Sequence, residues 1–259
     1  AIPTYNMEHL LPECVDSLLA CGYAEYTELL IIDDGSKDGS RQIAEQYAKQ
    51  YPQIVKAVHK ENGGHGSAVN LGMELATGQY FKVVDSDDAV EPAAYEDFLK
   101  RLENLGRKGC DLVAAPFACI QYEKKTDSYK HNIKKWGIEG ADQMPVGEIL
   151  PFADVADRLH VRMHEWTIRT AILKEHGIRL SERSFYVDMQ YILFPVPWIR
   201  TVCILDETVY RYRLGSEAQS VSIRSMQKNR GQHRAVLRSL TGFYKEREAQ
   251  GDSAGVLAY

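Results

Sequence analysis

The chain has 259 residues, of which 44% are hydrophobic and 26% are charged. This composition is typical of a globular protein and argues against a disordered chain. The length suits one large α/β domain, or one such domain with a small helical appendage. The net charge of -5 excludes an overall basic surface for nucleic acid. No apolar run approaches the roughly 18 residues that a membrane-spanning helix requires.

The five cysteines give no sign of a disulfide framework or a zinc site. Their number is odd and none forms a Cys-x-x-Cys pair. Reduced cysteines in a cytoplasmic protein are the simplest interpretation. Ala1-Ile2-Pro3 has the pattern of the second half of a strand, and Val256–Tyr259 is an apolar end. We therefore expect further residues on both sides of this sequence.

The first half of the chain alternates short apolar runs with helical patterns. The runs that predict strands are 29–32, 54–58, 80–84 and 112–115. Helical spacing of apolar residues begins near Leu11, before the first run, and near Ser40, Ala68 and Pro92, between the later runs. Alternating strands and helices predict an α/β fold with a mostly parallel central sheet and helices on both faces.

The second half is less regular. The expected elements are a hairpin or mobile loop over the site in Gln121–Ile138, helices in Ala153–His176 and Tyr186–Phe194, a closing pair of strands in Cys203–Leu205 and Val209–Arg213, and a helix in Arg224–Glu248. We therefore predict a domain of residues 1–222, followed by a truncated C-terminal helical extension of residues 223–259.

Two acidic turns follow two of the predicted strands. Asp33 and Asp34 end the first, and Asp85, Asp87 and Asp88 end the second. In parallel sheets, ligands bind at the carboxyl ends of the strands. Crowded carboxylates repel one another unless a cation compensates, and oxygen ligands select magnesium or manganese. The alternative for the second turn is a solvated cap of the following helix.

A glycine-rich loop, Asn62-Gly63-Gly64-His65-Gly66, precedes a predicted helix. Such a loop can bring backbone N–H groups close to a phosphate. It is not a P-loop, because no Gly-Lys-Ser/Thr follows, and it does not match the dinucleotide-binding fingerprint.

Several short motifs occur in one order at spacings typical of a known family. They are Ile2-Pro3-Thr4-Tyr5-Asn6, Ile31-Ile32-Asp33-Asp34-Gly35-Ser36, Asn62-Gly63-Gly64 with Asn70-Leu71-Gly72, Ala76-Thr77-Gly78-Gln79-Tyr80, Val84-Asp85-Ser86-Asp87-Asp88, Tyr186-Val187-Asp188 and the segment 205–213. Over about residues 1–222, the chain resembles the bacterial family 2 glycosyltransferases with the GT-A fold. Each motif is weak alone, but the ordered set is specific.

The resemblance implies an inverting transfer of a sugar from a nucleotide-diphosphate sugar, with a UDP-sugar favoured, to an acceptor hydroxyl in cell-surface polysaccharide or glycan synthesis. Pro3, Tyr5 and Asp34 would hold the base, with Tyr5 stacking on it. The full set of expected nucleotide-sugar-binding residues is Pro3, Thr4, Tyr5, Asp34, Asn62, Gly63, Asp85 and Ser86.

By the same resemblance, Asp85 and Asp87 would form an Asp-x-Asp element that meets the ribose and the metal-diphosphate. Asp87 and Asp88 are the expected ligands of a manganese or magnesium ion. Asp188 would be the general base of the family's Glu-Asp motif. Two positions depart from the family pattern: Val187 replaces the usual Glu, and Val69 stands where many relatives have an arginine.

Two other functions stay open at this point. A nucleotidyltransferase would also use carboxylates and magnesium, but it usually needs a glycine-rich loop with an arginine where Pro3–Asn6 stands. A non-catalytic nucleotide- or carbohydrate-binding module is the second alternative. It stays open because Val187 replaces the usual Glu of the family motif.

The expected partners are the donor and a glycan or lipid-linked acceptor, without nucleic acid. Five lysines at positions 124, 125, 130, 134 and 135 favour a solvated face, with attraction to an anionic acceptor or a membrane surface as the alternative. The expected location is therefore the cytoplasm, with contact to the inner face of the cytoplasmic membrane left open.

Overall fold

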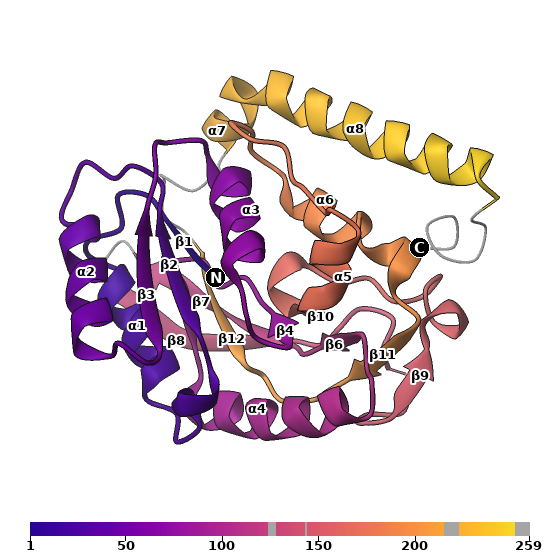
Figure 1. Ribbon diagram of the computed structural model, residues 1–259, viewed down its shortest axis with the longest axis horizontal. Helices are drawn as coiled ribbons and strands as arrows, with labels where there is room; N and C mark the ends of the chain where they lie inside the picture. Colours follow the sequence, from indigo (N-terminus) through magenta and orange to yellow (C-terminus); the bar gives the residue numbers. More distant parts are fainter. Residues whose placement is uncertain (124–127, 143, 215–222, 252–259) are drawn as a thin grey trace.

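A computed structural model of the chain describes residues 1–123, 128–142, 144–214 and 223–251 (Figure 1). It confirms the predicted α/β fold, in which strands form the centre and helices cover them on both sides. The first three strands, β1 (Ile2–Thr4), β2 (Leu29–Asp33) and β3 (Val55–His59), are parallel to one another. Their carboxyl ends therefore lie at one edge.

The remaining strands form two mixed sheets. One has the order β4-β10-β6-β11-β9, and the other has the order β5-β12-β7-β8. Their bounds are β4 (Tyr80–Phe81), β5 (Ala89–Val90), β6 (Leu112–Ala114), β7 (Phe117–Glu123), β8 (Ser128–Trp136), β9 (Ile149–Pro151), β10 (Trp166–Arg169), β11 (Thr201–Ile204) and β12 (Tyr210–Leu214). Around Ala1, backbone hydrogen bonds to Lys82 and from Val84 connect β1 to the segment after β4.

The helices are distributed over the two faces of the sheet (Figure 1). Their bounds are α1 (Leu11–Leu19), α2 (Ser40–Gln50), α3 (His65–Leu75), α4 (Pro92–Arg107), α5 (Thr170–Glu175), α6 (Asp188–Leu193), α7 (Ile223–Lys228) and α8 (Arg230–Ala249). Residues of α1, α2 and α4 share one hydrophobic cluster, while residues of α3, α5, α6 and α8 share the other.

Strand β2 shows why both faces are covered. Leu30 and Ile32 belong to the cluster that contains α3, and Leu29 and Ile31 belong to the opposite cluster. Because successive side chains of a strand point to opposite faces, a run of apolar residues is buried only between two layers of helices. The apolar run in β2 therefore requires a layer of helices on each face of the sheet, which gives three layers in all.

Two predictions for the second half were wrong. The segment Ala153–His176 is not one helix, because it contains strand β10, which lies between β4 and β6 in the sheet and follows and precedes short helical turns. Trp166 and Ile168 are fully buried there, and β-branched neighbours suit a strand that is packed on both faces. The predicted closing strands are both present, but their pairing with each other is wrong, since β11 pairs with β6 and β9, whereas β12 pairs with β5 and β7.

The predicted hairpin is confirmed in its strands, because β7 and β8 are antiparallel neighbours. Its connecting residues 124–127 and the side chains of the five lysines lie outside the described part of the chain. The C-terminal helical prediction is confirmed as two helices that meet at Asn229. The predicted domain boundary at residue 222 lies at the end of the undescribed range 215–222, so it stays a prediction.

All five cysteines are buried, and none of them forms a disulfide. Within the described residues, no helix is both long and apolar enough to cross a membrane.

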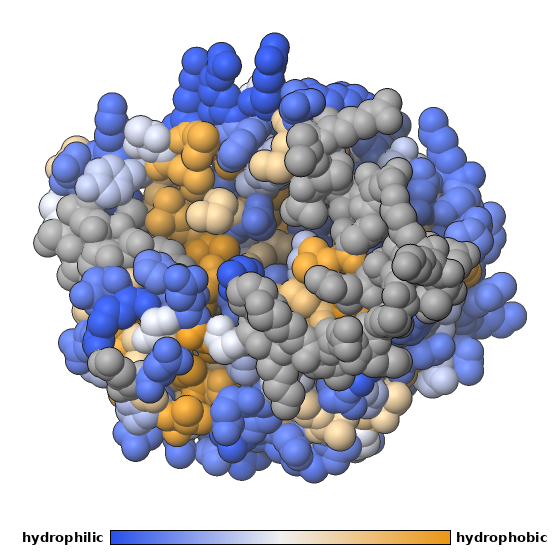
Figure 2. Space-filling model, turned by 180° about the vertical axis from the view of Figure 1, so that it is seen from behind, coloured by the Kyte–Doolittle hydropathy of each residue, from blue (hydrophilic) through white to orange (hydrophobic). Residues whose placement is uncertain are grey.

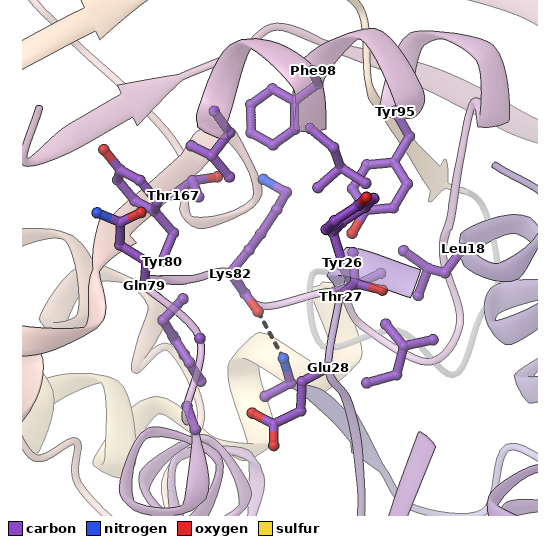
Figure 3. A pocket seen from close by; sticks show the side chains of 18 of the residues that line it. Leu18, Tyr26, Thr27, Glu28, Gln79, Tyr80, Lys82, Tyr95, Phe98 and Thr167 are labelled. Carbon is purple, nitrogen blue, oxygen red and sulfur yellow. Dashed lines mark hydrogen bonds between the residues drawn. The ribbon is translucent and has the colours of Figure 1, made fainter. Parts of the chain in front are cut away.

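A cavity of about 290 Å³ lies where β2 and β4 begin, under α4 (Figure 3). Lys82, Tyr80 and Glu28 line it together with Phe98. None of the predicted site residues lines this cavity, and it faces the starts of the strands. We therefore place the candidate site elsewhere, at the carboxyl ends.

Phe98 provides a test of the packing on the α4 side. Its side chain is 1% exposed, whereas that of Phe185 is 43% exposed. Truncation of a buried phenylalanine removes apolar contacts and leaves a cavity, so Phe98→Ala should lower the free energy of unfolding by about 3–5 kcal/mol. The same change at Phe185 should shift it by no more than about 0.5 kcal/mol. Urea unfolding measures both, and equal effects would contradict the described packing.

Candidate nucleotide-sugar site

The carboxylate of Asp34 organises the loop after β3. Its Oδ1 atom accepts hydrogen bonds from Lys60 Nζ at 2.7 Å and from the Gly63 amide at 2.9 Å, and its Oδ2 atom accepts one from the Gly64 amide at 2.7 Å. The backbone carbonyl of Asp34 accepts a bond from Asn62 Nδ2 at 2.9 Å. Two predicted loop residues, Asn62 and Gly63, are therefore tied directly to Asp34.

This arrangement argues against the loop as a phosphate cradle. The amides of Gly63 and Gly64 donate to the buried Asp34 carboxylate, so they are not directed at a ligand. An anion at the N-terminal end of a helix commonly takes such backbone donors, and here the protein supplies the anion itself.

The same loop packs against the segment that precedes α6. A Cβ atom on Gly66 would lie 2.3 Å from the Ser181 carbonyl oxygen, and Gly64 has a φ of +82° beside the backbone of Arg183. The Arg183 amide donates to the Gly63 carbonyl at 2.5 Å. The close approach at Gly66 is possible because glycine has no Cβ atom, and the positive φ at Gly64 is one that glycine adopts readily. The two loops therefore meet directly.

Two buried amide side chains fix the position of that segment. Asn70 on α3 donates to the Leu180 carbonyl at 3.0 Å and accepts from the Leu180 amide at 2.8 Å. Gln190 on α6 accepts from the Ser181 amide at 2.8 Å and donates to Ser181 Oγ at 2.9 Å. Because each bond joins residues from different elements, the start of α6 is held beside the start of α3.

Asp188 is the first residue of α6, and Val187 before it is buried in the core. The residue Asp188 as a whole is exposed, yet enough protein surrounds its carboxyl group for burial to raise its pKa. His65 opposes this rise, and the negative charge of Asp85 adds to it. The charges of Asp188 and Asp85 thus both raise the pKa of one imidazole, although only Asp85 is in hydrogen-bond contact with it.

His65 connects the glycine loop to the second acidic turn. As the first residue of α3, it donates from Nε2 to Asp85 Oδ1 at 2.8 Å. Burial favours neutral imidazole, but the charge and hydrogen bond of Asp85 outweigh it and raise the pKa of His65. Burial likewise opposes ionisation of Asp85, but His65 outweighs it and holds the pKa of Asp85 below its usual range.

Residues of strand β12 hold the second acidic turn in place by hydrogen bonds. Tyr210 donates its hydroxyl hydrogen to Asp88 Oδ2 at 2.6 Å and accepts from the Asp85 amide at 3.1 Å. The Arg213 amide donates to Asp88 Oδ1 at 2.7 Å, and its Nη1 donates to the Asp87 carbonyl at 2.7 Å. Asp88 is 0% exposed, and both of its oxygens are used inside the protein. Its geometry therefore favours an anchoring role over the predicted metal-binding role.

Asp87 differs from Asp88 because it is only partly buried. Burial, followed by the nearby charge of Asp85, raises the pKa of Asp87 to about 6. No group of three or more His, Cys, Asp or Glu side chains that could hold a metal occurs among the described residues. Magnesium and manganese often bind through one or two carboxylates plus substrate phosphates, so a partly exposed, crowded Asp87 fits that mode.

The predicted residues of β1 divide into buried and exposed positions. Pro3 and Thr4 are buried, and the Pro3 carbonyl accepts a bond from Ser86 Oγ at 2.8 Å. The Thr4 carbonyl accepts from the Asp34 amide at 2.8 Å. Tyr5, at 43% exposed, is the member of this group whose ring can meet a ligand. Pro3, Thr4 and Ser86 instead join β1 to the two acidic turns.

Sequence reasoning missed the roles of His65, Tyr210 and Arg213. His65 lay within a quoted motif, but a histidine between glycines carries no signal of its partner 20 residues away. Tyr210 and Arg213 lie more than 120 residues from Asp88 along the chain. Their alternation predicted a strand, and only the pairing of that strand brings them to the acidic turn.

The chain is similar in sequence to known proteins. The model of the family described as "Glycosyl transferase family 2" matches residues 1–169. The chain is 28% identical over 226 residues to the uncharacterized glycosyltransferase EpsJ of Bacillus subtilis, which covers 82% of this chain and 59% of EpsJ.

Two similar solved structures contain nucleotide sugars. S. aureus TarS (residues 1–349) in complex with UDP-GlcNAc has a TM-score of 0.63 at 21% identity, covering 83% of this chain and 58% of that one. The mannosyltransferase PcManGT of Pyrobaculum calidifontis, in complex with GDP-Man and Mn²⁺, has a TM-score of 0.61 at 16% identity, covering 92% and 63%. These likenesses establish the GT-A fold, and the chain spans less than two thirds of each of these proteins.

The raised pKa of Asp87 leads to a prediction about stability without metal. The folded protein holds a proton on Asp87 more tightly than the unfolded chain, in which the pKa is near 3.8. Stability should therefore fall as the pH rises from about 4 to about 6. Asp87→Asn cannot ionise, so it should be more stable than wild type at about pH 7.5 and gain nothing at about pH 4.

Urea unfolding in the presence of a chelator measures this difference. Asp97→Asn, at an exposed aspartate of α4, is the control and should follow wild type at both pH values. An Asp87→Asn protein with the wild-type pH dependence would contradict the assigned crowding.

Proposed function

Because the family model matches residues 1–169, the chain belongs to glycosyl transferase family 2, and we propose that it transfers a sugar from a nucleotide-diphosphate sugar to an acceptor hydroxyl. The observation that supports this most directly is the 2.8 Å contact between His65 and Asp85 near the carboxyl edge of the strands, where the negative charges of Asp188 and Asp87 also raise the pKa of His65. Ligands of open α/β sheets bind at this edge.

In this proposal, the donor lies over the ends of β1 and β2. The exposed ring of Tyr5 stacks on the base. Asp34 acts through the loop that it holds, since its oxygens are already bonded to Lys60, Gly63 and Gly64. A UDP-sugar is the favoured donor, with a likeness to a UDP-GlcNAc complex as support. The acceptor is a glycan or a lipid-linked sugar of cell-surface polymer synthesis.

Asp87 is the proposed metal ligand of this chain, with Asp85 placed beside it by His65. A divalent cation, when bound, would neutralise the charge that develops on the diphosphate leaving group. The likeness to a Mn²⁺-containing transferase supports manganese or magnesium. Asp88 is left out of this set, because Tyr210 and the Arg213 amide already use both of its oxygens.

Asp188 is the proposed general base. It accepts the proton of the acceptor hydroxyl while the hydroxyl oxygen bonds to the anomeric carbon, and the bond from that carbon to the nucleoside diphosphate breaks with inversion. The burial of its carboxyl group raises its pKa and makes it a stronger proton acceptor than an aspartate with the ordinary pKa. The hydrogen bonds of Asn70 and Gln190 hold the base in position.

Asp188→Asn tests the base. The amide keeps the shape but cannot accept the proton, so turnover should fall by at least about 100-fold. Calorimetry in manganese should still detect UDP binding with an affinity near that of wild type. Asp97→Asn should leave turnover unchanged, and near-normal turnover by Asp188→Asn would show that another group is the base.

A thermal-shift panel of nucleotides, with and without manganese, tests the donor site. A ligand that binds only the folded state raises the apparent melting temperature, so a UDP-sugar with manganese should raise it most. Asp87→Ala should abolish the manganese-dependent part of this rise, because it removes the metal ligand. If no nucleotide sugar changes the melting temperature of wild type, or if pyrophosphate is released from a nucleoside triphosphate and a sugar phosphate, the transferase proposal fails.

A further inference from the structure

The C-terminal helices carry positive charge without any acidic residue over a long stretch. Residues 223–245 contain six Lys and Arg and no Asp or Glu, in a chain whose net charge is -5. The stretch ends at Glu246 and Glu248. Such segregation of charge differs from the mixed distribution of an ordinary solvated helix.

Helix α8 has an inner and an outer face. Val236 is buried, and Leu240 and Phe243 pack against the same core cluster. Arg230, Arg234 and Arg238 follow one another every four residues on the opposite face, and all are exposed. None of the three forms an ion pair with another described residue.

The position of this face in the molecule is favourable for contact. Helix α8 runs along the outer edge of the molecule (Figure 1). Seen from behind, that upper edge carries projecting hydrophilic side chains (Figure 2).

Large apolar side chains lie exposed among these cations. Leu237 is 52% exposed and Tyr244 is 39% exposed, and a spacing of seven residues puts them on one side of α8. Met226, on the preceding helix α7, is 45% exposed. Arginines interleaved with exposed leucine and aromatic side chains are typical of helices that lie in a membrane interface.

We propose that the outer face of α7 and α8 docks on an anionic phospholipid surface. The cations of this face, Lys228, Arg230, Arg234, Arg238 and Lys245, complement the negative headgroups. Met226, Leu237 and Tyr244 enter the boundary between headgroups and acyl chains. A soluble polyanion would bind the cations but would give no partner to these apolar side chains, which is why we commit to the bilayer.

Docking there would place α8 between the lipid and the segment that begins α6, so the candidate site would lie near the lipid surface. The inner face of α8 contacts the segment that carries Asp188: Gln190 Nε2 donates to Ser239 Oγ at 3.0 Å, and the Phe185 amide donates to Gln232 Oε1 at 2.9 Å. The acceptor class that follows is a lipid-linked one. This last step rests on the proposed function, whereas the docking itself does not.

Co-sedimentation with vesicles tests the docking. Wild type should bind vesicles that contain phosphatidylglycerol and should not bind phosphatidylcholine alone, and added salt should weaken the binding. Arg234→Glu/Arg238→Glu should lower partition by at least about tenfold. Lys49→Glu/Lys108→Glu changes the net charge equally at exposed sites of α2 and the end of α4, and it should bind as wild type. Equal loss in both double variants, or no wild-type binding, would overturn the proposal.

Leu237→Ser/Tyr244→Ser separates the bilayer from a soluble polyanion. This variant should lose vesicle binding while it keeps any binding of soluble polyphosphate. If it binds vesicles as well as wild type does, the surface is a polyanion site and the membrane proposal is wrong. Circular dichroism melting confirms that each variant is folded. Since the readout is binding rather than turnover, failure of the proposed transferase activity leaves this test intact.

Discussion

The site depends on how the protein accommodates several carboxylates at one edge of its sheet. Asp34 follows β2, and Asp85, Asp87 and Asp88 lie in the turn between β4 and β5. Protein surrounds these carboxyl groups, so little water reaches them. Each one has a different solution. Asp34 is bonded by a lysine and two amides, Asp85 by His65, and Asp88 by Tyr210 and a backbone amide. Of these four, only Asp87 combines a raised pKa with partial exposure, so it is the one left for an added cation.

These different hydrogen-bond surroundings separate carboxylates with a structural role from carboxylates with a functional role. A buried carboxylate whose oxygens are fully hydrogen-bonded is held in place and cannot take a further ligand. Asp34 and Asp88 are of this kind, and they fix the glycine loop and the second acidic turn. Asp87 and Asp188 carry charge that the protein does not fully satisfy. Groups with this property, gathered in one place, are the ones that chemistry can use.

Helix α8 links this edge to the outside of the molecule. Its inner side bonds to the segment of Gln190 and Phe185, and its outer side carries exposed arginines that form no ion pair with another described residue. A contact made by the outer face would therefore bear on the helix that begins at Asp188.

The sequence by itself determined the α/β fold, the acidic strand ends and the family, because these depend on local periodicity and on short ordered motifs. It could not place β10, whose apolar residues also fit a helix, and it could not pair β11 and β12, since pairing depends on contacts distant in the chain. It marked Asp87 and Asp88 as equivalent neighbours. Only the tertiary structure distinguished them, because Tyr210 and Arg213 reach Asp88 through β12 and leave Asp87 open.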